Sequence, residues 1–459
     1  MYFEQIPTPG LGCYSYVIGC PEAGVMLVVD PRRDTGIYLS TAEEKGMRIT
    51  HIFDTHVHAD HISGAQQLRA ETGANIYMHE SAQVKYQAKK VKDGDEFILG
   101  NVFARILHTP GHTPNSISLI VSDLARSTEP EMILTGDLLF VGDIGRPDLP
   151  GEEILDEQIV NLFDSLHKTL GQLPDYLEVY PGHGQGSLCG QGMSAKPNTT
   201  LGYERLCNPM MQYRDFEEFR KAILSNLPVR PQSFSAIIPG NMELVSLIPF
   251  CEDLSEYALS VDKTDELRNK GVTLLDLRDA ISFSAAHIPG SIHVDASVST
   301  MLNWIGMVIP PAAQLVLILP CDRSFEEMRL ELLRIGYDDA IIGWLKGGLD
   351  AWLSSGKETK SIPLLSAAEL RNRMAESDPP IVIDVRGLAE FSEVSIEGSV
   401  NVPFATVLED DSCTDQIKKK AVIVCASGFR SSIAASILQA GGCVDISVLY
   451  GGISAWENS

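Results

Sequence analysis

Four side chains that can ligate a metal fall within six residues of the sequence, namely His56, His58, Asp60 and His61. One face of a single helix or strand cannot present all four, because side chains share a face every three or four residues in a helix and every two in a strand. They therefore fit a loop that leaves a strand end and wraps around a cation. Imidazole together with carboxylate favours zinc or iron, whereas calcium and magnesium prefer oxygen ligands alone.

Three further ligands follow, each beside glycine and each after a short apolar run. His112 stands in the loop 109–114, which two prolines and a glycine make rigid. Asp137 follows the apolar run Met132–Leu134 and could bridge two metals, and His183 lies between two glycines. A Gly-His pair alone is more often a plain turn, but seven ligands in four strand-end loops predict a metal centre.

A second reactive motif begins at Cys425, which follows an apolar run and precedes a predicted helix over Ser431–Gln439. Backbone N–H groups of such a loop converge on its centre, and the helix N-terminus adds positive potential. With the charge of Arg430, the loop would stabilise a thiolate or persulfide anion at Cys425. A structural cysteine is commoner at a strand end, but the Cys-x-x-Gly-x-Arg-Ser spacing favours catalysis. The other residues of this persulfide loop are Ala426, Ser427, Gly428, Phe429 and Ser431.

Composition bounds the class of protein. The 459 residues, 44% hydrophobic and 21% charged, suit a soluble globular protein of several domains. A net charge of −25 argues against nucleic-acid or anionic-membrane binding. Nine cysteines in a chain of this length do not form a disulfide framework, and neither a signal peptide nor a membrane-length apolar run is visible. We expect a cytoplasmic protein.

Short β-type runs must position the metal ligands. Hydrophobic periodicity predicts antiparallel strands over Tyr14–Ile18 and Val25–Val29, and a helical region from Asn198 to Asn226. Further predicted elements are helices over Ile37–Lys45 and Ser63–Thr72 and strands over Ile49–Phe53, Ile76–Met78 and Val102–His108.

The second half contains an internal repeat, with a boundary near Lys357–Pro363. In each copy apolar strands alternate with helical stretches, which predicts a parallel sheet wrapped by helices. The corresponding segments are Leu274–Arg278 with Val382–Arg386, His287–Val294 with Ser395–Val402, and Gly347–Trp352 with Gly451–Trp456.

The first copy departs from the cysteine motif. Depending on which glycine anchors the alignment, Pro320 or Cys321 lies opposite Cys425. The loop glycine and arginine are replaced, and acidic residues would repel an anionic sulfur; these are Asp322, Glu326 and Glu327. We expect a spacer or interface domain without sulfurtransferase activity; the alternative is a relay thiol at Cys321.

The order His-x-His-x-Asp-His, Gly-His-Thr, Gly-Asp and Pro-Gly-His resembles the metallo-β-lactamase superfamily over residues 1–250. The resemblance implies an αββα sandwich with the metals at one edge. Asp137 stands where the true β-lactamases have a cysteine, so this part is more similar to the glyoxalase II and persulfide dioxygenase branch. Gly145-Arg146-Pro147-Asp148 is similar to the dioxygenase pattern.

The repeats resemble two rhodanese domains, a degenerate copy at 255–358 and an active copy at 362–459. The expected fold class is therefore α+β and α/β multidomain, an αββα sandwich followed by two α/β rhodanese-like domains. The whole chain resembles fusions of persulfide dioxygenase with rhodanese. This resemblance implies one Fe(II) per chain, held by His56, His112 and Asp137.

The resemblance also implies the chemistry. O₂ would oxidise a persulfide of glutathione, coenzyme A or bacillithiol type to sulfite, and a Cys425 persulfide would yield thiosulfate. The remaining metal-loop residues would either orient the ligands or hold a second metal; these are His58, Asp60, His61 and His183. Arg146, Asp148 and Cys207 are expected near the substrate, and Cys207 or Cys20 could relay sulfur.

Two other classes remain open: a binuclear glyoxalase II-like thioester hydrolase, which would take zinc, and a sulfur-sensing scaffold. The apolar stretch Met301–Pro311, with Trp304 and Trp344, could form the interface of a homo-oligomer. No motif marks the other cysteines, namely Cys13, Cys189, Cys251, Cys413 and Cys443.

Overall fold

The computed structural model describes residues 1–190, 192–225, 227, 230–249, 253–321, 323–409 and 420–459. The chain divides into two compact units. Unit 1 comprises Met1–Cys251 with Leu330–Tyr337, and unit 2 comprises Glu252–Arg329 with Asp338–Ser459. The predicted metal ligands all lie in unit 1, and the persulfide loop lies in unit 2.

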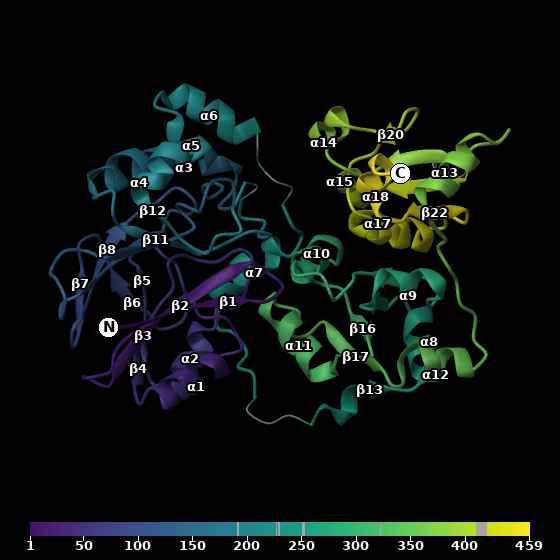
Figure 1. Ribbon diagram of the computed structural model, residues 1–459. Coiled ribbons are helices and arrows are strands. Elements are labelled where there is room, and N and C mark those ends of the chain that lie inside the picture. Colours follow the sequence, from purple (N-terminus) through teal and green to yellow (C-terminus); the bar gives the residue numbers. More distant parts are fainter. Residues whose placement is uncertain (191, 226, 228–229, 250–252, 322, 410–419) are drawn as a thin grey trace. The chain divides into compact units, whose positions relative to one another are not determined.

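Unit 1 is built on two six-stranded sheets (Figure 1). The first sheet runs in the order β1 (Tyr2–Thr8), β2 (Cys13–Cys20), β3 (Val25–Val29), β4 (Arg48–Phe53), β5 (Asn75–His79) and β6 (Lys89–Val91). The second runs in the order β12 (Thr199–Thr200), β11 (Glu178–Pro181), β10 (Met132–Gly136), β9 (Ile117–Asp123), β8 (Val102–His108) and β7 (Glu96–Leu99).

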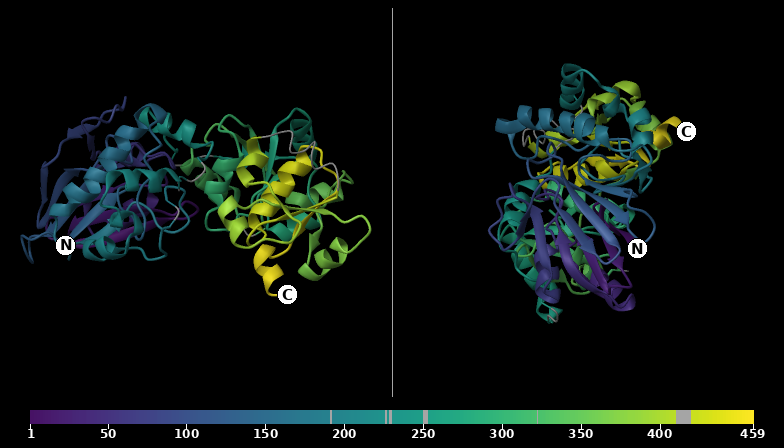
Figure 2. Two further views of the ribbon diagram at one scale, coloured as in Figure 1. Left: turned by 90° about the horizontal axis from the view of Figure 1, so that it is seen from above. Right: turned by 90° about the vertical axis from the view of Figure 1, so that its left-hand side faces the viewer.

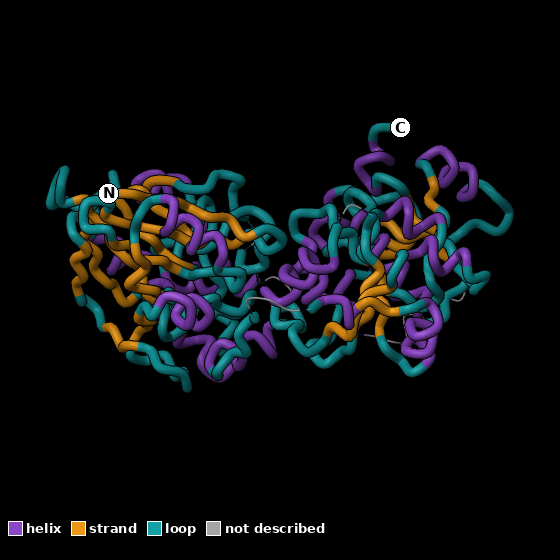
Figure 3. The backbone as a smooth tube through the Cα atoms, turned by 90° about the horizontal axis from the view of Figure 1, so that it is seen from below, coloured by secondary structure: helices purple, strands orange, loops and turns teal. Residues whose placement is uncertain are grey.

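One apolar cluster lies between these two sheets, and two others lie between each sheet and the helices that cover it. Strand β8 alternates buried Val102, Ala104 and Ile106 with partly exposed residues, and its buried face meets the first sheet in a common core. Tyr38 of α1 (Gly36–Glu44) and Leu68 of α2 (Ala65–Thr72) pack on the outer face of the first sheet. The second sheet is covered by α3 (Leu155–Asp164), α4 (Leu201–Cys207), α5 (Pro209–Gln212) and α6 (Phe216–Ser225). Figure 3 shows this orange group of strands flanked by purple helices, which confirms the αββα sandwich.

The predicted antiparallel pairing of the two early strands is confirmed by the register of β2 with β3. The region from Asn198 to Asn226 is more broken than expected, since β12 and three short helices replace one helical stretch. The side chains of Thr200 and Asn208 cap α4 and α5 by accepting backbone N–H groups, and Pro209 begins α5. Capping residues followed by proline start new helices rather than extend one.

The topology brings three ligand loops to one edge of the second sheet. Strands β10 and β11 pair in parallel, and β8 and β10 each pair antiparallel with β9, so β8, β10 and β11 point the same way. The loops of His112, Asp137 and His183 follow the carboxyl ends of these strands. The first sheet reaches the same edge through β4, because the Ile117 N–H donates to the Thr55 carbonyl at 2.8 Å.

Unit 2 contains two five-stranded sheets in which all pairs are parallel, as the repeat predicted. Figure 2 shows the yellow C-terminal part of the chain, which contains both strands and helices of the second copy. The first copy orders β13 (Ala258–Leu259), β17 (Ile341–Leu345), β16 (Leu315–Ile318), β14 (Thr273–Asp276) and β15 (Ile292–His293). The second orders β18 (Leu364–Leu365), β22 (Ile446–Leu449), β21 (Ala421–Val424), β19 (Ile381–Asp384) and β20 (Val400–Asn401).

Helices accompany both sheets of unit 2. The first copy has α8 (Val261–Asn269), α9 (Ala280–Ala285), α10 (Met301–Val308), α12 (Gly348–Ser354) and α11 (Phe325–Arg334), whose residues from Leu330 on fall in unit 1. The second has α13 (Ala367–Met374), α14 (Leu388–Glu393), α15 (Phe404–Glu409), α17 (Phe429–Ala440) and α18 (Gly452–Glu457). Unit 1 additionally contains α7 (Phe234–Met242). Within the described parts of the chain, no helix has both the length and the apolar character needed to cross a membrane.

The stretch Met301–Pro311, expected at an interface between subunits, is used inside unit 2. Most of α10 is buried, and the ring of Trp304 contacts Phe404 and Phe429 of the second copy. Its apolar side chains therefore join the two copies to each other.

The fold predicts separate stability for the two units. All four tryptophans of the chain lie in unit 2, so tryptophan fluorescence reports the unfolding of that unit. Leu274→Ala, which opens a void beside buried Trp352, should lower the free energy of unfolding by about 2–5 kcal/mol and shift the fluorescence transition to lower urea. Leu119→Ala in the core of unit 1 should leave the fluorescence transition in place while shifting far-UV circular dichroism. Equal fluorescence shifts for both variants would contradict this division.

Candidate metal centre and persulfide loop

Three ligand atoms face one another without a protein partner: His56 Nε2, His112 Nε2 and Asp137 Oδ2. Asp137 Oδ2 lies 3.3 Å from His112 Nε2 and 4.0 Å from His56 Nε2. All three side chains are buried, and an unpartnered buried polar atom is costly. Two imidazoles and one carboxylate converging in this way fit a transition metal, so the residues present form a metal-binding site.

The rings of both histidines are held with Nε2 toward the metal position. His56 Nδ1 lies 2.9 Å from Thr55 Oγ1, which itself donates to Asp30 Oδ2 at 2.8 Å. His112 Nδ1 donates to the Arg146 carbonyl at 2.8 Å. Burial lowers the pKa of both imidazoles, which favours the neutral form that binds metals.

Asp137 remains ionised despite its burial. Burial opposes ionisation, but the charge of His183 and its hydrogen bond to the carboxylate hold the pKa of the Asp137 carboxyl below its ordinary value. Gly182 is required beside it, because a Cβ at this position would lie 2.4 Å from Asp137 Oδ1. The glycine of the Pro-Gly-His motif therefore lets the backbone pass close to the Asp137 carboxylate, and the histidine of the motif is a candidate ligand.

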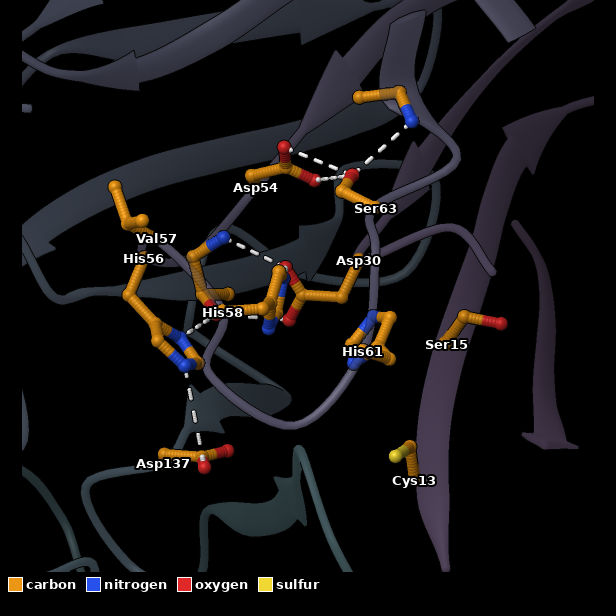
Figure 4. A network of polar contacts seen from close by, with 12 residues as sticks. Cys13, Ser15, Asp30, Asp54, His56, Val57, His58, His61, Ser63 and Asp137 are labelled. Atoms are coloured by element: carbon orange, nitrogen blue, oxygen red, sulfur yellow. Dashed lines mark hydrogen bonds and ion pairs between the residues drawn. The ribbon is translucent and has the colours of Figure 1, made fainter. Parts of the chain in front are cut away.

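His58 is paired with Asp30 (Figure 4). Its Nε2 lies 3.2 Å from Asp30 Oδ1, and the same carboxylate accepts the Thr55 N–H at 2.6 Å. Asp30 adopts a left-handed backbone with a φ of 50°, which is uncommon outside glycine. The Asp30 carboxylate thus orients the ring of His56 through Thr55 and also contacts the ring of His58 directly.

Asp60 is hydrogen-bonded to both His61 and His183, and His183 is also hydrogen-bonded to Asp137. Asp60 Oδ2 lies 2.8 Å from His183 Nε2, and Asp60 Oδ1 lies 3.1 Å from His61 Nδ1. His183 Nδ1 lies 2.7 Å from Asp137 Oδ1. The structure therefore brings all seven predicted ligands together. The triad atoms and His58 Nδ1 have no protein partner, whereas Asp60, His61 and His183 are joined by hydrogen bonds.

Two cysteines that no sequence motif marks lie beside His183. The Cys13 thiol donates to Asp60 Oδ2 at 2.9 Å, and Cys189 has its sulfur within 4.8 Å of ligand atoms of Asp137 and His183. Burial raises the pKa of the Cys13 thiol well above its ordinary value and that of Cys189 to about 12. Only tertiary folding reveals them, because Cys13 reaches the site through a bridge between β2 and the His183 loop. Cys20 and Cys443 are buried core residues, and Cys251 and Cys413 lie outside the described residues.

Asn241 of α7 is a site residue that the sequence did not indicate. Its Nδ2 donates to the carbonyls of His58 at 2.9 Å and His61 at 2.7 Å, and its Oδ1 accepts the Ser63 N–H at 2.9 Å. One buried amide therefore holds the loop that carries the first four ligands from more than 170 residues away in sequence.

Arg146 and Asp148 form a bidentate pair at 2.7 Å for both contacts. Although burial opposes it, the bonds from Arg146 leave the pKa of the Asp148 carboxyl below its ordinary value. Arg146 and Cys189 line a cavity of about 390 Å³ together with Met210. Cys207 is exposed at the end of α4.

The persulfide loop is a tight turn between β21 and α17. The Gly428 N–H donates to Cys425 Sγ at 3.2 Å, and Ser431 Oγ lies 3.4 Å from the same sulfur. Helix α17 begins at Phe429, two residues before the predicted start, so Arg430 lies in its first turn. Cys425 is buried.

The repeated Gly-Gly motif closes the loop from the other side. The N–H groups of Ile453 and Ser454 donate to the carbonyls of Cys425 at 2.8 Å and Ala426 at 3.1 Å. Gly452 has a φ of +59°, and a Cβ there would lie 2.3 Å from the Cys425 carbonyl oxygen. The motif was recognised only as a repeat, but in this copy it seats α18 on the cysteine loop.

Arg430 is paired with Glu390 of α14 through contacts of 2.8 and 2.6 Å. These bonds raise the pKa of the guanidinium. Arg430 is thus held near the loop with part of its charge balanced by a carboxylate that the sequence did not indicate.

Strand register settles which residue of the first copy corresponds to Cys425, and both sequence alignments were wrong. Asp276 pairs with Ile318 as Asp384 pairs with Val424, so Leu319 takes the place of Cys425. Cys321 lies two residues further on, exposed beside a cavity of about 1000 Å³ that Leu319 also lines. The loop runs from 319 to 324 before α11, against 425 to 428 before α17. Asp322 lies outside the described residues.

Comparisons with known proteins agree with this architecture. The metallo-β-lactamase superfamily model matches residues 8–183, and the rhodanese-like domain model matches residues 260–355 and 366–459. A metallo-β-lactamase structure from Staphylococcus aureus is 31% identical with a TM-score of 0.67 and covers 75% of this chain and 98% of its own. The chain belongs to the metallo-β-lactamase superfamily and carries two rhodanese-like domains.

Two kinds of relative match unit 1. The hydroxyacylglutathione hydrolase of Nitrosococcus oceani is 33% identical over 173 residues, which is 37% of this chain and 61% of the relative. The mitochondrial persulfide dioxygenase ETHE1 of Bos taurus is 29% identical over 244 residues, which is 52% of this chain and 87% of the relative. The chain thus spans less than two thirds of the hydrolase.

The contacts of Asn241 predict a metal-affinity effect. Asn241→Ala should weaken metal binding by about 10–100-fold, because the loop carrying His56 loses its anchor. Competition with a chelator, followed by metal analysis, measures the change. Gln66→Ala is the matched control, because Gln66 also bonds the end of α7 at the Glu243 carbonyl but does not touch the ligand loop. Equal affinity in the two variants would contradict the assignment.

Proposed function

We propose that unit 1 is an iron-dependent dioxygenase that oxidises a low-molecular-weight persulfide to sulfite. We further propose that Cys425 carries sulfane sulfur and delivers it to sulfite as thiosulfate. The observation that carries the first proposal is the set of three unpartnered atoms on His56, His112 and Asp137. These two histidines and one carboxylate would hold Fe(II), which would supply a site for both the substrate and O₂.

The remaining ligands support one metal per chain rather than two. His58 Nε2 is paired with Asp30, although His58 Nδ1 has no partner, and both ring nitrogens of His183 contact carboxylate oxygens. Asp60 already accepts from Cys13 as well. A second metal would have to break this network, whereas the triad needs no rearrangement.

The proposed reaction balances as RSSH + O₂ + H₂O → RSH + SO₃²⁻ + 2H⁺. The outer sulfur loses the four electrons that O₂ gains. When bound, Fe(II) would supply a site where the persulfide sulfur and O₂ meet. The chain's own residues hold the two imidazoles neutral and aimed, through Thr55 and the Arg146 carbonyl, and exclude water by burial.

The cavity beside Cys189 and Arg146 is our proposed position for the organic part of the persulfide. Its lining continues to the metal site, because Arg146 accepts the His112 N–H. Arg146 and Asp148 were both expected near the substrate; Arg146 lines this cavity, and Asp148 holds its guanidinium in a bidentate pair. A carrier of glutathione, coenzyme A or bacillithiol type is our proposal for RSH.

The transfer half also balances. The Cys425 thiolate takes the outer sulfur of RSSH and releases RSH, leaving a cysteine persulfide anion. Sulfite then takes that sulfur, which gives thiosulfate and restores the thiolate. The Gly428 N–H and the first turn of α17 stabilise the anionic sulfur at both stages.

The seven described cysteines are all free, which supports a reducing compartment and hence our proposal of a cytoplasmic protein. A homo-oligomer remains a prediction.

A binuclear thioester hydrolase is the second candidate for unit 1. It is favoured by the hydroxyacylglutathione hydrolase relatives and by the presence of all seven ligands. Such an enzyme would use two metals and a metal-activated water as nucleophile. Metal stoichiometry therefore separates the two candidates.

Protein purified without oxygen should contain about one iron per chain and consume O₂ when glutathione persulfide is added. His112→Ala should abolish both properties, because it removes one ligand of the triad. Metal analysis and an oxygen electrode measure them on one sample. Two metals per chain, no oxygen uptake and cleavage of a glutathione thioester would reject the dioxygenase and establish the hydrolase.

Cys425→Ser should abolish thiosulfate formation while oxygen uptake continues, so sulfite accumulates instead. Ion chromatography of the products measures both anions. Cys443→Ser is the control, because Cys443 is a buried thiol of the same copy outside the loop. Undiminished thiosulfate from Cys425→Ser would assign transfer elsewhere and leave the second copy as a scaffold.

A further inference from the structure

The first turn of α17 decides whether backbone N–H groups reach the sulfur of Cys425. Gly428 caps this helix, and the Ser432 N–H makes its first bond to the Gly428 carbonyl at 3.1 Å. Because Arg430 is partly balanced by Glu390, the loop and helix dipoles carry a larger share of anion stabilisation. Any force that fixes this turn therefore bears on the reactivity of Cys425.

One such contact comes from the first copy, through His293 of β15. Ser432 Oγ lies 3.1 Å from His293 Nδ1 in a buried setting. His293 Nε2 must donate to the Arg278 carbonyl at 2.9 Å, since a carbonyl only accepts. Burial lowers the pKa of this imidazole. The ring is therefore neutral, and its Nδ1 accepts the Ser432 hydroxyl proton.

A second contact comes from α10 of the same copy. The ring of Trp304 meets Phe429, the first residue of α17, edge to face at 5.6 Å between centroids and 78° between planes. It meets Phe404 in the same way at 5.2 Å. Edge-to-face geometry is the favoured arrangement for aromatic pairs. Two residues of one copy thus contact the two ends of the first turn, Phe429 and Ser432. Figure 1 shows α10 next to α17.

Other contacts between the copies lie further along α17. The His293 N–H donates to Ser436 Oγ at 3.0 Å, and His287 Nε2 lies 2.7 Å from Gln439 Oε1. These bonds are buried and dock the body of the helix, one turn or more beyond the loop. They supply a natural comparison for the contacts at the first turn.

We propose that the first rhodanese-like copy is a clamp on the cysteine site of the second, with His293 and Trp304 as positioning residues for Cys425. The proposal rests on the sulfur transfer proposed above and assigns the copy without a reactive cysteine a part in it. The hydroxyl of Ser432 and the ring of Phe429 are the points at which the clamp acts. With them fixed, the Gly428 N–H stays within bonding distance of the sulfur.

The test compares two serines on one helix in the full chain. Ser432→Ala removes the hydroxyl bonded to His293 at the first turn, and Ser436→Ala removes one bonded to the same residue a turn later. The readout is the rate of Cys425 alkylation by iodoacetamide between pH 6 and 9, with Cys425→Ser correcting for other thiols. We expect Ser432→Ala to slow alkylation at neutral pH by about tenfold and to move its pH midpoint upward, because anionic sulfur is the reactive form. Ser436→Ala should change the rate less than twofold.

Substitutions at His293 and Trp304 test whether these two residues themselves affect the reactivity of Cys425. In His293→Phe, adding Ser432→Ala should not slow alkylation further, because each substitution removes the same hydrogen bond between Ser432 and His293. Trp304→Ala should slow alkylation and Trp304→Phe should restore most of the rate. If His293→Phe does not fold, as judged by far-UV circular dichroism, the two serine variants decide the question alone.

Unchanged alkylation in Ser432→Ala and Trp304→Ala would overturn the clamp. Equal slowing in Ser432→Ala and Ser436→Ala would also overturn it, because general loosening of the interface would then explain both. The alkylation assay does not depend on the natural sulfur donor. If Cys425→Ser still forms thiosulfate, the proposed transfer fails while the clamp is judged separately.

Discussion

The arrangement of the candidate metal site in unit 1 depends on the contacts of the Asp137 carboxylate. One of its oxygens contacts His183, and the other faces His56 and His112 without a protein partner. A buried carboxylate in this state is unfavourable unless a cation balances it. The edge at which β8, β10 and β11 end is therefore organised to hold a metal, and the loops around it are organised to aim the ligands.

The surroundings of this carboxylate determine which ligands remain available. Asp30 contacts the ring of His58 and accepts the hydroxyl proton of Thr55, which in turn contacts the ring of His56. Asp60 accepts from Cys13 and contacts His183. The same seven ligand types can serve hydrolysis with two metals or oxidation with one, and the difference lies in which of them are occupied by neighbours. Hydrogen-bond partners outside the ligand set are thus as informative as the ligands.

The two rhodanese-like copies show how one fold can carry different roles. Their sheets have the same strand order, but Leu319 replaces Cys425 and the loop that follows is two residues longer. The first copy lacks a sulfur nucleophile at that position. Its packing against α17 nevertheless places His293 and Trp304 next to the loop of the second copy.

The sequence by itself determined the parallel sheets of the repeat, because hydrophobic periodicity is a local feature. The order of the histidine and aspartate motifs carried the resemblance that implied the αββα sandwich, and the same local motifs named the candidate ligands. Helix breaks near Asn208-Pro209 were also locally encoded, although we predicted one helical region there. Local patterns also located the cysteine loop.

Tertiary structure alone decided the pairings. Cys13 and Asn241 lie far from the ligand loops in sequence and reach them only after folding. The replacement of Cys425 by Leu319 depends on strand register, which glycine spacing could not fix because the loops differ in length. Long-range hydrogen bonds and register arise from packing between elements, and no short sequence window contains both partners.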